Sequence, residues 1–530
     1  MQLEDDELDD LMSEDGLKFV KNSVRDWEDC FKENVERYIT SKKFLLVSTV
    51  NDSDASLLND MNRPPMEFNQ LDAIGCKLMG EFSSQEPGIV VAASDGIIVD
   101  DEIAMTVECV EAHMRHDLAH TNNGNANNKV FKDTVYGGYG CFEVYTEYAS
   151  KSSFEQVAPY RRVNPTICGW DPMAIETHKG DGKYCYTKVY MTHERVMLNF
   201  GKQIADSLSY NSSGDFGDSV FQWSYQSGRK KIAVIVFFYY KHERRGKLLL
   251  LSNGESMDEK KYKAQMKEWD ELSILPPPPT IQDSREQIFT DIVRYTVCEN
   301  KVIKREETDF EMLPLVFVDG NSAEAQGEKG GGIRQVTRSY FYNAFDSQRF
   351  KDFAGQTFAG ELQATMQSPI IAAEESIPDQ YLDNYLTPSR ASVLIYRSRY
   401  KDQPDQPLPP PQIINRPEVP QYIPAAFYGA DKLIQTTLGN YDTQLAMQPQ
   451  VSGVALQEGS MDSDAAAKPY VDSLFEGIDR VAQIKLNLIP KLYKTPRSIP
   501  ITLKNGKKSY AIVNTEDYAP SQNQDRKSVV

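Results

Sequence analysis

Four residues with metal-binding or acid–base side chains stand close together in the sequence: His113, His116, Asp117 and His120. Spacings of three and seven residues place the three imidazoles on one face of a helix, where together they can ligate zinc. The simpler interpretation is a polar face near the C-terminal end of a helix, where positive charge is favoured. We therefore expect no metal site. The alternative is a zinc-dependent enzyme built on these histidines. Metal analysis, together with the effect of a chelator on stability, would decide between the two interpretations.

The common catalytic motifs are missing from the sequence. It contains no GxxxxGKS/T phosphate loop, no HExxH pair, no GxSxG elbow and no complete GxGxxG fingerprint. The seven cysteines are scattered and none forms a CxxC pair, which is typical of reduced thiols in a reducing compartment. The sequence therefore predicts neither catalytic residues nor a cofactor, and we expect the chain not to be an enzyme.

Basic residues occur in small clusters, most of which are typical of solvated faces. One cluster differs because it lies beside an apolar run at residues 232–240, and it favours a docking surface. This set contains Lys241, Arg244, Arg245, Lys260 and Lys261. A second basic set is predicted on one long helix: Arg334, Arg338, Arg349 and Lys351. Salt bridges between subunits are the safer interpretation of this set, and contact with DNA phosphates is the alternative.

The overall charge limits the possible partners. The 530 residues carry 58 lysines and arginines against 77 aspartates and glutamates, a formal net charge of −19. Such a surface repels nucleic acid and anionic membranes, which excludes a protein that grips DNA by neutralising its phosphates. The longest apolar run is far below the roughly 20 residues that cross a bilayer. Eight acids lie between Glu4 and Asp15, and we expect this leader to be disordered, with docking on a basic partner as the alternative.

The length predicts two to four domains at about 150 residues each. In the first half, apolar residues at three- and four-residue steps predict helices over residues 17–38, 67–82 and 101–120. A strand is expected at 88–93 and a loop in the asparagine-rich stretch 121–129. A helix end, a glycine turn and a strand are expected over 130–148, followed by short β segments over 157–192 and a short helix from Thr192.

The second half reads as an α/β insert followed by long helices. Strands at 232–240 and 288–297 flank a charged helix at 257–272, and a strand at 313–318 closes the insert. A glycine-rich linker at 327–332 is expected to open one long helix over 333–367. A proline-rich connector at 404–424, helices at 425–443 and 464–493, and a hairpin at 499–513 with its turn at Asn505 and Gly506 complete the prediction.

This order of parts resembles the portal proteins of tailed phages, in particular those of short-tailed phages. The resemblance extends over residues 20–513. It is carried by NRPPMEFNQLDAIGCKLMGEFSSQEPGIVV (62–91), DTVYGGYGCFEVYTEY (133–148), VNPTICGWDPMA (163–174) and LPLVFVDG (313–320), and by the late block SGVALQEGSMDSDAAAKPYVDSLFEGIDRVAQIKLNLIPKLY (452–493) with the ITLKNGKK that follows it. One departure is that many members continue into a longer helical crown or barrel.

The resemblance implies an α+β, multi-domain portal fold. Its parts would be an acidic leader at 1–16, a helical and β wing at 17–231, an α/β clip at 232–320 and a stem helix at 321–370. A wing return with the proline-rich connector and tunnel segment would follow at 371–448, and a crown-proximal helix with the C-terminal hairpin at 449–530. Tunnel candidates on this scheme are Lys432, Gln435 and Asn440.

The resemblance also implies a function, which is a ring of twelve copies at one capsid vertex through which double-stranded DNA enters and leaves. The basic residues of the clip would bind the large terminase subunit and then the tail adaptor proteins, while other faces meet the major capsid and scaffolding proteins. ATP hydrolysis would belong to the terminase. The chain would be part of the virion, after assembly in the host cytoplasm, with no membrane partner. A cytoplasmic scaffold that forms no ring is a further alternative.

Overall fold

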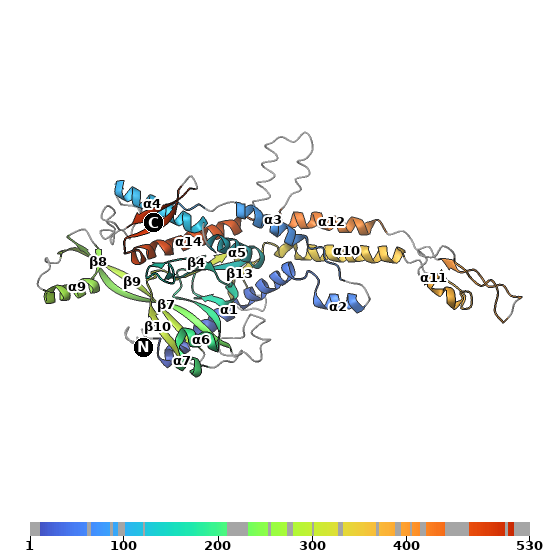
Figure 1. Ribbon diagram of the computed structural model, residues 1–530, viewed down its shortest axis with the longest axis horizontal. Helices are drawn as coiled ribbons and strands as arrows, with labels where there is room; N and C mark the ends of the chain where they lie inside the picture. The colour runs from blue at the N-terminus through green and yellow to red at the C-terminus, as the bar shows by residue number, and fades with distance from the viewer. Residues whose placement is uncertain are drawn as a thin grey trace, which may run out of the picture. The chain divides into compact units, whose positions relative to one another are not determined.

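The computed structural model divides the chain into two compact units. Unit 1 comprises residues 1–42, 75–342 and 467–530, and unit 2 comprises residues 43–74 and 343–466. Helices and strands are mixed in the chain, which confirms the α+β class (Figure 1). The structure describes residues 11–513 except 61–64, 85–87, 94–100, 120–121, 209–231, 253–255, 273–278, 299–300, 327–331, 367–369, 387–393, 403–404, 414–419, 440–465 and 504–506.

The first helix, α1 (Glu14–Leu46), is longer than the predicted 17–38 at both ends. The Ser13 hydroxyl accepts a hydrogen bond from the Gly16 amide at 3.0 Å, as an N-terminal cap does. Two acids in the first turn, Glu14 and Asp15, favour the positive end of the helix dipole. The acidic leader before them lies outside the described residues for positions 1–10.

Two sheets form the body of unit 1. The smaller has the order β11–β1–β4, and the larger has the order β10–β9–β7–β6–β5 with β8 paired to β7. Helix α1 contacts the larger sheet, because the hydroxyls of Tyr184 and Tyr186 donate to backbone carbonyls of α1. The strands are β1 (Tyr139–Val144), β4 (Tyr160–Arg162), β5 (Cys168–Trp170), β6 (Tyr184–Thr192), β7 (Ile232–Leu251), β8 (Ser256–Asp258), β9 (Ile281–Cys298), β10 (Lys301–Glu307) and β11 (Leu315–Asp319).

Helices and a small ribbon surround these sheets. They are α4 (Asp101–Ala119), α5 (Asn122–Gly137), α6 (His193–Phe200), α7 (Lys202–Ser207), α9 (Glu259–Leu272), α14 (Lys468–Leu492) and the ribbon β2 (Glu147–Tyr148) with β3 (Gln156–Val157), while α3 (Gln70–Ser84) begins in unit 2. The predicted glycine turn is confirmed, since Gly138 joins α5 to β1 with a φ of 102°. The predicted helices at 101–120 and 464–493 are confirmed with slightly shifted ends.

Two predictions in the first half are wrong. The asparagine-rich stretch 121–129 is the first part of helix α5 rather than a loop, because its Ala126 and Asn127 are buried and Asn127 accepts a hydrogen bond from the Tyr160 hydroxyl at 3.1 Å. Residues 88–93 form no strand. Their Val91 is buried, and its amide donates to the Glu111 carboxylate instead of to a neighbouring strand.

The single long helix predicted over 333–367 is also wrong. Its first part is the strand β13 (Ile333–Arg338), which pairs antiparallel with β12 (Asn321–Gln326). The glycine-rich stretch between them therefore connects two strands of a hairpin, although residues 327–331 lie outside the described part. The helix proper is α10 (Phe345–Met366), and it belongs to unit 2.

Unit 2 is built around a pair of helices, α10 and α12 (Tyr422–Thr437). Gly355 of α10 allows close packing, because a Cβ there would stand 2.4 Å from the Phe68 ring. The unit also contains α2 (Asp52–Asp60), α11 (Leu382–Leu386) and the short pair β14 (Ile370–Ile371) and β15 (Gln412–Ile413).

The C-terminal hairpin is confirmed as β16 (Arg497–Thr502) paired with β17 (Lys508–Val513), although its turn lies outside the described residues. Strand β16 packs on α4. Within the part of the chain that the structure describes, no helix combines the length and the apolar character needed to cross a membrane.

Candidate functional site

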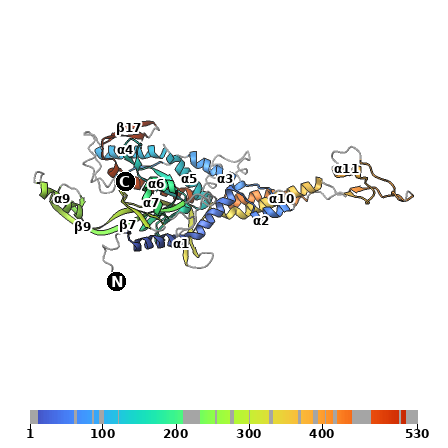
Figure 2. The same ribbon diagram turned by 60° about the horizontal axis from the view of Figure 1, so that its bottom comes forward.

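The longest feature of unit 1 is the antiparallel ladder between β7 and β9, which runs from Ile235 opposite Cys298 to Leu251 opposite Ile281. At about 3.3 Å per residue, the 20 residues of β7 extend over roughly 65 Å. The inner half of the ladder is buried in the sheet, whereas residues 281–288 of β9 are exposed. We call the outer half the arm: residues 241–251 of β7, residues 281–292 of β9, β8 and α9. Figure 2 shows the arm leaving the body of the unit.

Arg244 of the arm is held by the protein itself. Its guanidinium forms an ion pair with Asp258, whose side chain is only 5% exposed, and lies 4.8 Å above the Phe289 ring. Burial alone would raise the pKa of Asp258, but hydrogen bonds from Arg244 and from the Lys260 amide outweigh that effect and lower the pKa. Arg244 therefore ties β7 to the start of α9 and is not free to bind a partner.

Lys241 is likewise engaged within the protein. Its ammonium donates a hydrogen bond to the Gly180 carbonyl at 2.6 Å, and burial together with nearby Arg480 lowers its pKa. The structure places Lys241 at the base of the arm, where the ladder enters the body of the unit.

The remaining cations predicted for docking are exposed. Arg245 stands across the ladder from Ile288, which is 57% exposed, while Lys260 and Lys261 lie in the first turn of α9. Cations at that end of a helix oppose the helix dipole, so helix stability does not explain them. Sequence reasoning missed Lys247, which is also exposed and lies two residues beyond Arg245 on the same face of β7. The alternation of Arg245 and Lys247 could have revealed it.

The second basic set, predicted on one helix, is split between the two units. Arg334 and Arg338 lie on strand β13 of unit 1, where the Arg338 guanidinium sits 4.9 Å above the Tyr342 ring. Arg349 and Lys351 lie on α10 of unit 2. Arg349 is exposed and pairs with Asp346 at 2.9 Å, while Lys351 is buried and pairs with Asp431 at 2.6 Å.

The tunnel candidates lie on or just beyond α12. Lys432 is exposed and Gln435 is half-buried on this helix, and Asn440 lies outside the described residues. These residues belong to unit 2, whereas the arm belongs to unit 1.

The histidines are engaged in holding the C-terminal hairpin. His113 is 5% exposed; its Nδ1 lies 3.0 Å from the Pro500 carbonyl and must donate to it, so Nε2 accepts from the Tyr493 hydroxyl at 3.1 Å. Burial lowers the pKa of His113. His116 contacts the Thr502 hydroxyl at 3.2 Å, and His120 lies outside the described residues. Among the residues that the structure describes, no three His, Cys, Asp or Glu side chains are grouped to hold a metal ion.

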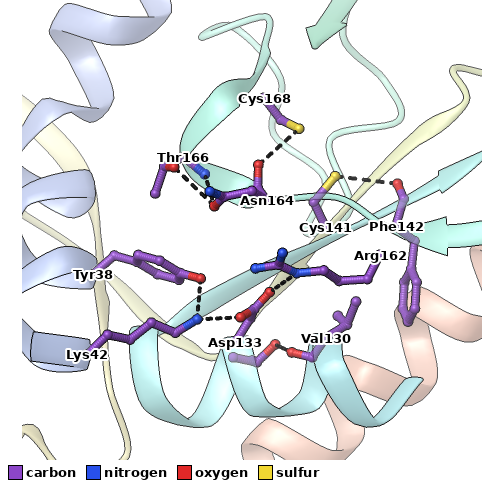
Figure 3. A network of polar contacts seen from close by, with 11 residues as sticks. Tyr38, Lys42, Val130, Asp133, Cys141, Phe142, Arg162, Asn164, Thr166 and Cys168 are labelled. Atoms are coloured by element: carbon purple, nitrogen blue, oxygen red, sulfur yellow. Dashed lines mark hydrogen bonds and ion pairs between the residues drawn. The ribbon is translucent and has the colours of Figure 1, made fainter. Parts of the chain in front are cut away.

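A buried ion-pair network joins α1, α5 and β4 (Figure 3). The Asp133 carboxylate pairs with Lys42 and accepts a hydrogen bond from Arg162 Nε at 2.6 Å. The Lys42 ammonium also donates to the Tyr38 hydroxyl at 2.6 Å, and burial raises the pKa of Tyr38 far above its usual value. Lys42 and Arg162 share the single Asp133 carboxylate, so the network links three elements of unit 1.

The described part of unit 1 is therefore an α+β body with a long two-stranded arm, whose exposed cations lie beyond the packed core. The sequence pattern of the phage P22-like portal protein family matches residues 21–529, almost the whole chain. The chain therefore belongs to the phage P22-like portal protein family. No curated protein matches it at a significant level.

Membership of this family establishes the general role. Portal proteins are structural proteins of the phage head that assemble as homo-oligomeric rings at a capsid vertex, connect the head to the tail, and take part in genome packaging and capsid assembly. The resemblance noted from the order of parts is thereby confirmed.

Proposed function

We propose that this chain forms a ring of twelve copies whose central channel carries double-stranded DNA into the head and out of it. The match to the portal family over residues 21–529 is the observation that carries this proposal. The charge supports it, because a net −19 per chain repels phosphates and lets a duplex slide instead of being held. The chain itself has no catalytic role, and its ring assembles in the host cytoplasm with the capsid and scaffolding proteins.

Electron microscopy of the purified chain tests this function. Top views should show a ring with rotational symmetry and a central channel. A compact monomer at micromolar concentration would refute the proposal, and an oligomer without a channel would favour the scaffold alternative.

We propose further that the arm is the part of the clip that binds the large terminase subunit and later the tail adaptor proteins. Its exposed cations Arg245, Lys247, Lys260 and Lys261 support this role, since they lie beyond the packed core of unit 1. Arg244 has a structural role instead, because removing it would leave the buried Asp258 carboxylate unpaired.

Reversing the charge of Arg245 with Arg245→Glu is expected to weaken terminase binding by roughly tenfold, because exposed interfacial charges steer association. Ring assembly and thermal stability should stay unchanged. Binding can be measured by surface plasmon resonance on immobilised rings at two salt concentrations, and the difference between variant and parent should shrink at the higher one. Lys151→Glu, at a cation that is also exposed and lies far along the chain from the arm, is the matched control. Equal affinity of Arg245→Glu and parent rings would contradict the role of the arm.

A further inference from the structure

The helix pair of unit 2 carries two exposed stripes of largely apolar residues. On α10 the stripe is formed by Phe353, which is 69% exposed, and Phe350, which is 44% exposed. On α12 it is formed by Tyr422, Ala425, Tyr428, Gly429, Lys432, Leu433 and Thr436, all of them exposed. Figures 1 and 2 show the two helices side by side. We call these surfaces the α10 stripe and the α12 stripe.

The two stripes point away from each other. The ion pair between Lys351 and Asp431 marks the sides on which the helices face one another. Phe353 is two residues from Lys351, and Gly429 is two residues from Asp431. Because each residue turns a helix by about 100°, Phe353 lies roughly 200° around α10 from Lys351, and Gly429 lies roughly 100–140° around α12 from the buried Ile423, Ala430 and Ile434. The pair therefore presents an aromatic surface on each of its two opposite sides.

The stripes also differ in shape. Phe353 projects from α10 as a bulky side chain, flanked by Phe350. Gly429 carries no side chain and so leaves a notch in the α12 stripe; apart from its chain neighbours and the nearby backbone of α12, no described atom lies within 4 Å of the place where a Cβ would stand. Large side chains border this notch, with Tyr428 at 68% exposed and Leu433 at 48% exposed. Bulky side chains that insert between the side chains of a facing helix are the usual way in which helices pack.

A second copy of the chain is the partner that fits this arrangement. A closed ring of identical subunits uses head-to-tail contacts, so each subunit must carry two different, complementary faces. The helix pair has a projecting face and a notched face on opposite sides, and portal proteins assemble as homo-oligomeric rings. We propose that the α10 stripe of one copy packs on the α12 stripe of the next, with Phe353 seated at Gly429. This inference rests on the proposed ring.

The experiment compares Phe353→Ala, Gly429→Phe and the double variant in the full chain. Each single variant should raise the concentration of half-maximal ring assembly at least about tenfold, because the first removes the projecting ring and the second fills the notch. In the double variant the new phenyl group occupies the space that Phe353 leaves, and assembly should return to within about threefold of the parent. Mass photometry over a dilution series measures these concentrations.

Two controls separate this contact from general effects. Phe154→Ala truncates a phenylalanine that is 95% exposed in unit 1 and should assemble like the parent. The melting temperature of Gly429→Phe should be no lower than that of the parent, since any residue other than proline favours a helix over glycine. Unchanged assembly in both single variants, or a double variant no better than the worse single one, would overturn the inference. A parent that forms no ring would overturn the proposed function with it.

Discussion

Replacing Trp170 by alanine is expected to lower the free energy of unfolding of unit 1 by about 4 kcal/mol. The indole is fully buried, with its ring centroid 5.5 Å from that of Trp27 in α1 and 5.2 Å from that of Phe317 in β11. Its Nε1 donates a hydrogen bond to the Leu315 carbonyl at 3.2 Å. Alanine would leave a cavity where α1 meets both sheets, together with a buried carbonyl that has lost its donor.

Denaturant titration followed by circular dichroism measures this loss. Trp170→Phe keeps a ring in the core and loses part of its volume and the hydrogen bond, so it should cost about 1–2 kcal/mol. Phe154→Ala, at an exposed position, should change the free energy by less than about 0.5 kcal/mol. A cost below about 1 kcal/mol for Trp170→Ala would show that α1 and the two sheets do not meet at this side chain.

Replacing Asp133 by asparagine is expected to cost unit 1 about 3 kcal/mol at neutral pH. The asparagine keeps the shape of the carboxylate but removes the negative charge that Lys42 and Arg162 share, whose side chains are only 22% and 29% exposed. Two half-buried cations would then stand close together without a counter-ion (Figure 3).

The cost of Asp133→Asn should depend on pH. Burial lowers the pKa of Lys42 and the Asp133 carboxylate opposes that effect, so the pKa falls further in the variant. A lysine whose pKa is lower in the folded state destabilises the fold most at low and neutral pH. The penalty therefore decreases as the pH rises towards the ordinary lysine pKa of about 10.4.

A double-mutant cycle isolates the pair. Adding Lys42→Met to Asp133→Asn removes one unpaired cation, so the double variant should be at least about 1 kcal/mol more stable than the sum of the single effects. Strictly additive effects, or a cost of Asp133→Asn that is constant between pH 7 and pH 10, would contradict an ion pair at this position.

The periodicity of the sequence predicted those helices whose partners lie on a single face. Helix α14 is the clearest case, because Leu474, Ile478 and Val481 repeat along one buried side. The first half of helix α5 escaped prediction because its asparagines have weak helix propensity, whereas the tertiary contact of Asn127 with Tyr160 favours this stretch as a helix. The hairpin of β12 and β13 was not predicted, because a glycine-rich stretch is compatible with both a linker and a turn.

The candidate site on the arm shows the same limit of prediction from sequence, because contacts between distant residues decide which side chains are exposed. The run of basic residues after the apolar strand includes Arg245, which is exposed in the structure. Sequence alone could not separate Arg245 from Arg244, because the partner of Arg244 is 14 residues away in β8 and is brought to it only by strand pairing. The alternation of the strand decides which of two neighbouring arginines faces a buried carboxylate and which remains exposed.

The subunit number of the assembled protein tests the central claim most directly. Native mass spectrometry of the purified chain at micromolar concentration should give one dominant species of about 720 kDa, the mass of twelve chains of 60.0 kDa in a closed ring. A dominant mass of 60.0 kDa under conditions in which the chain is folded would contradict the portal ring.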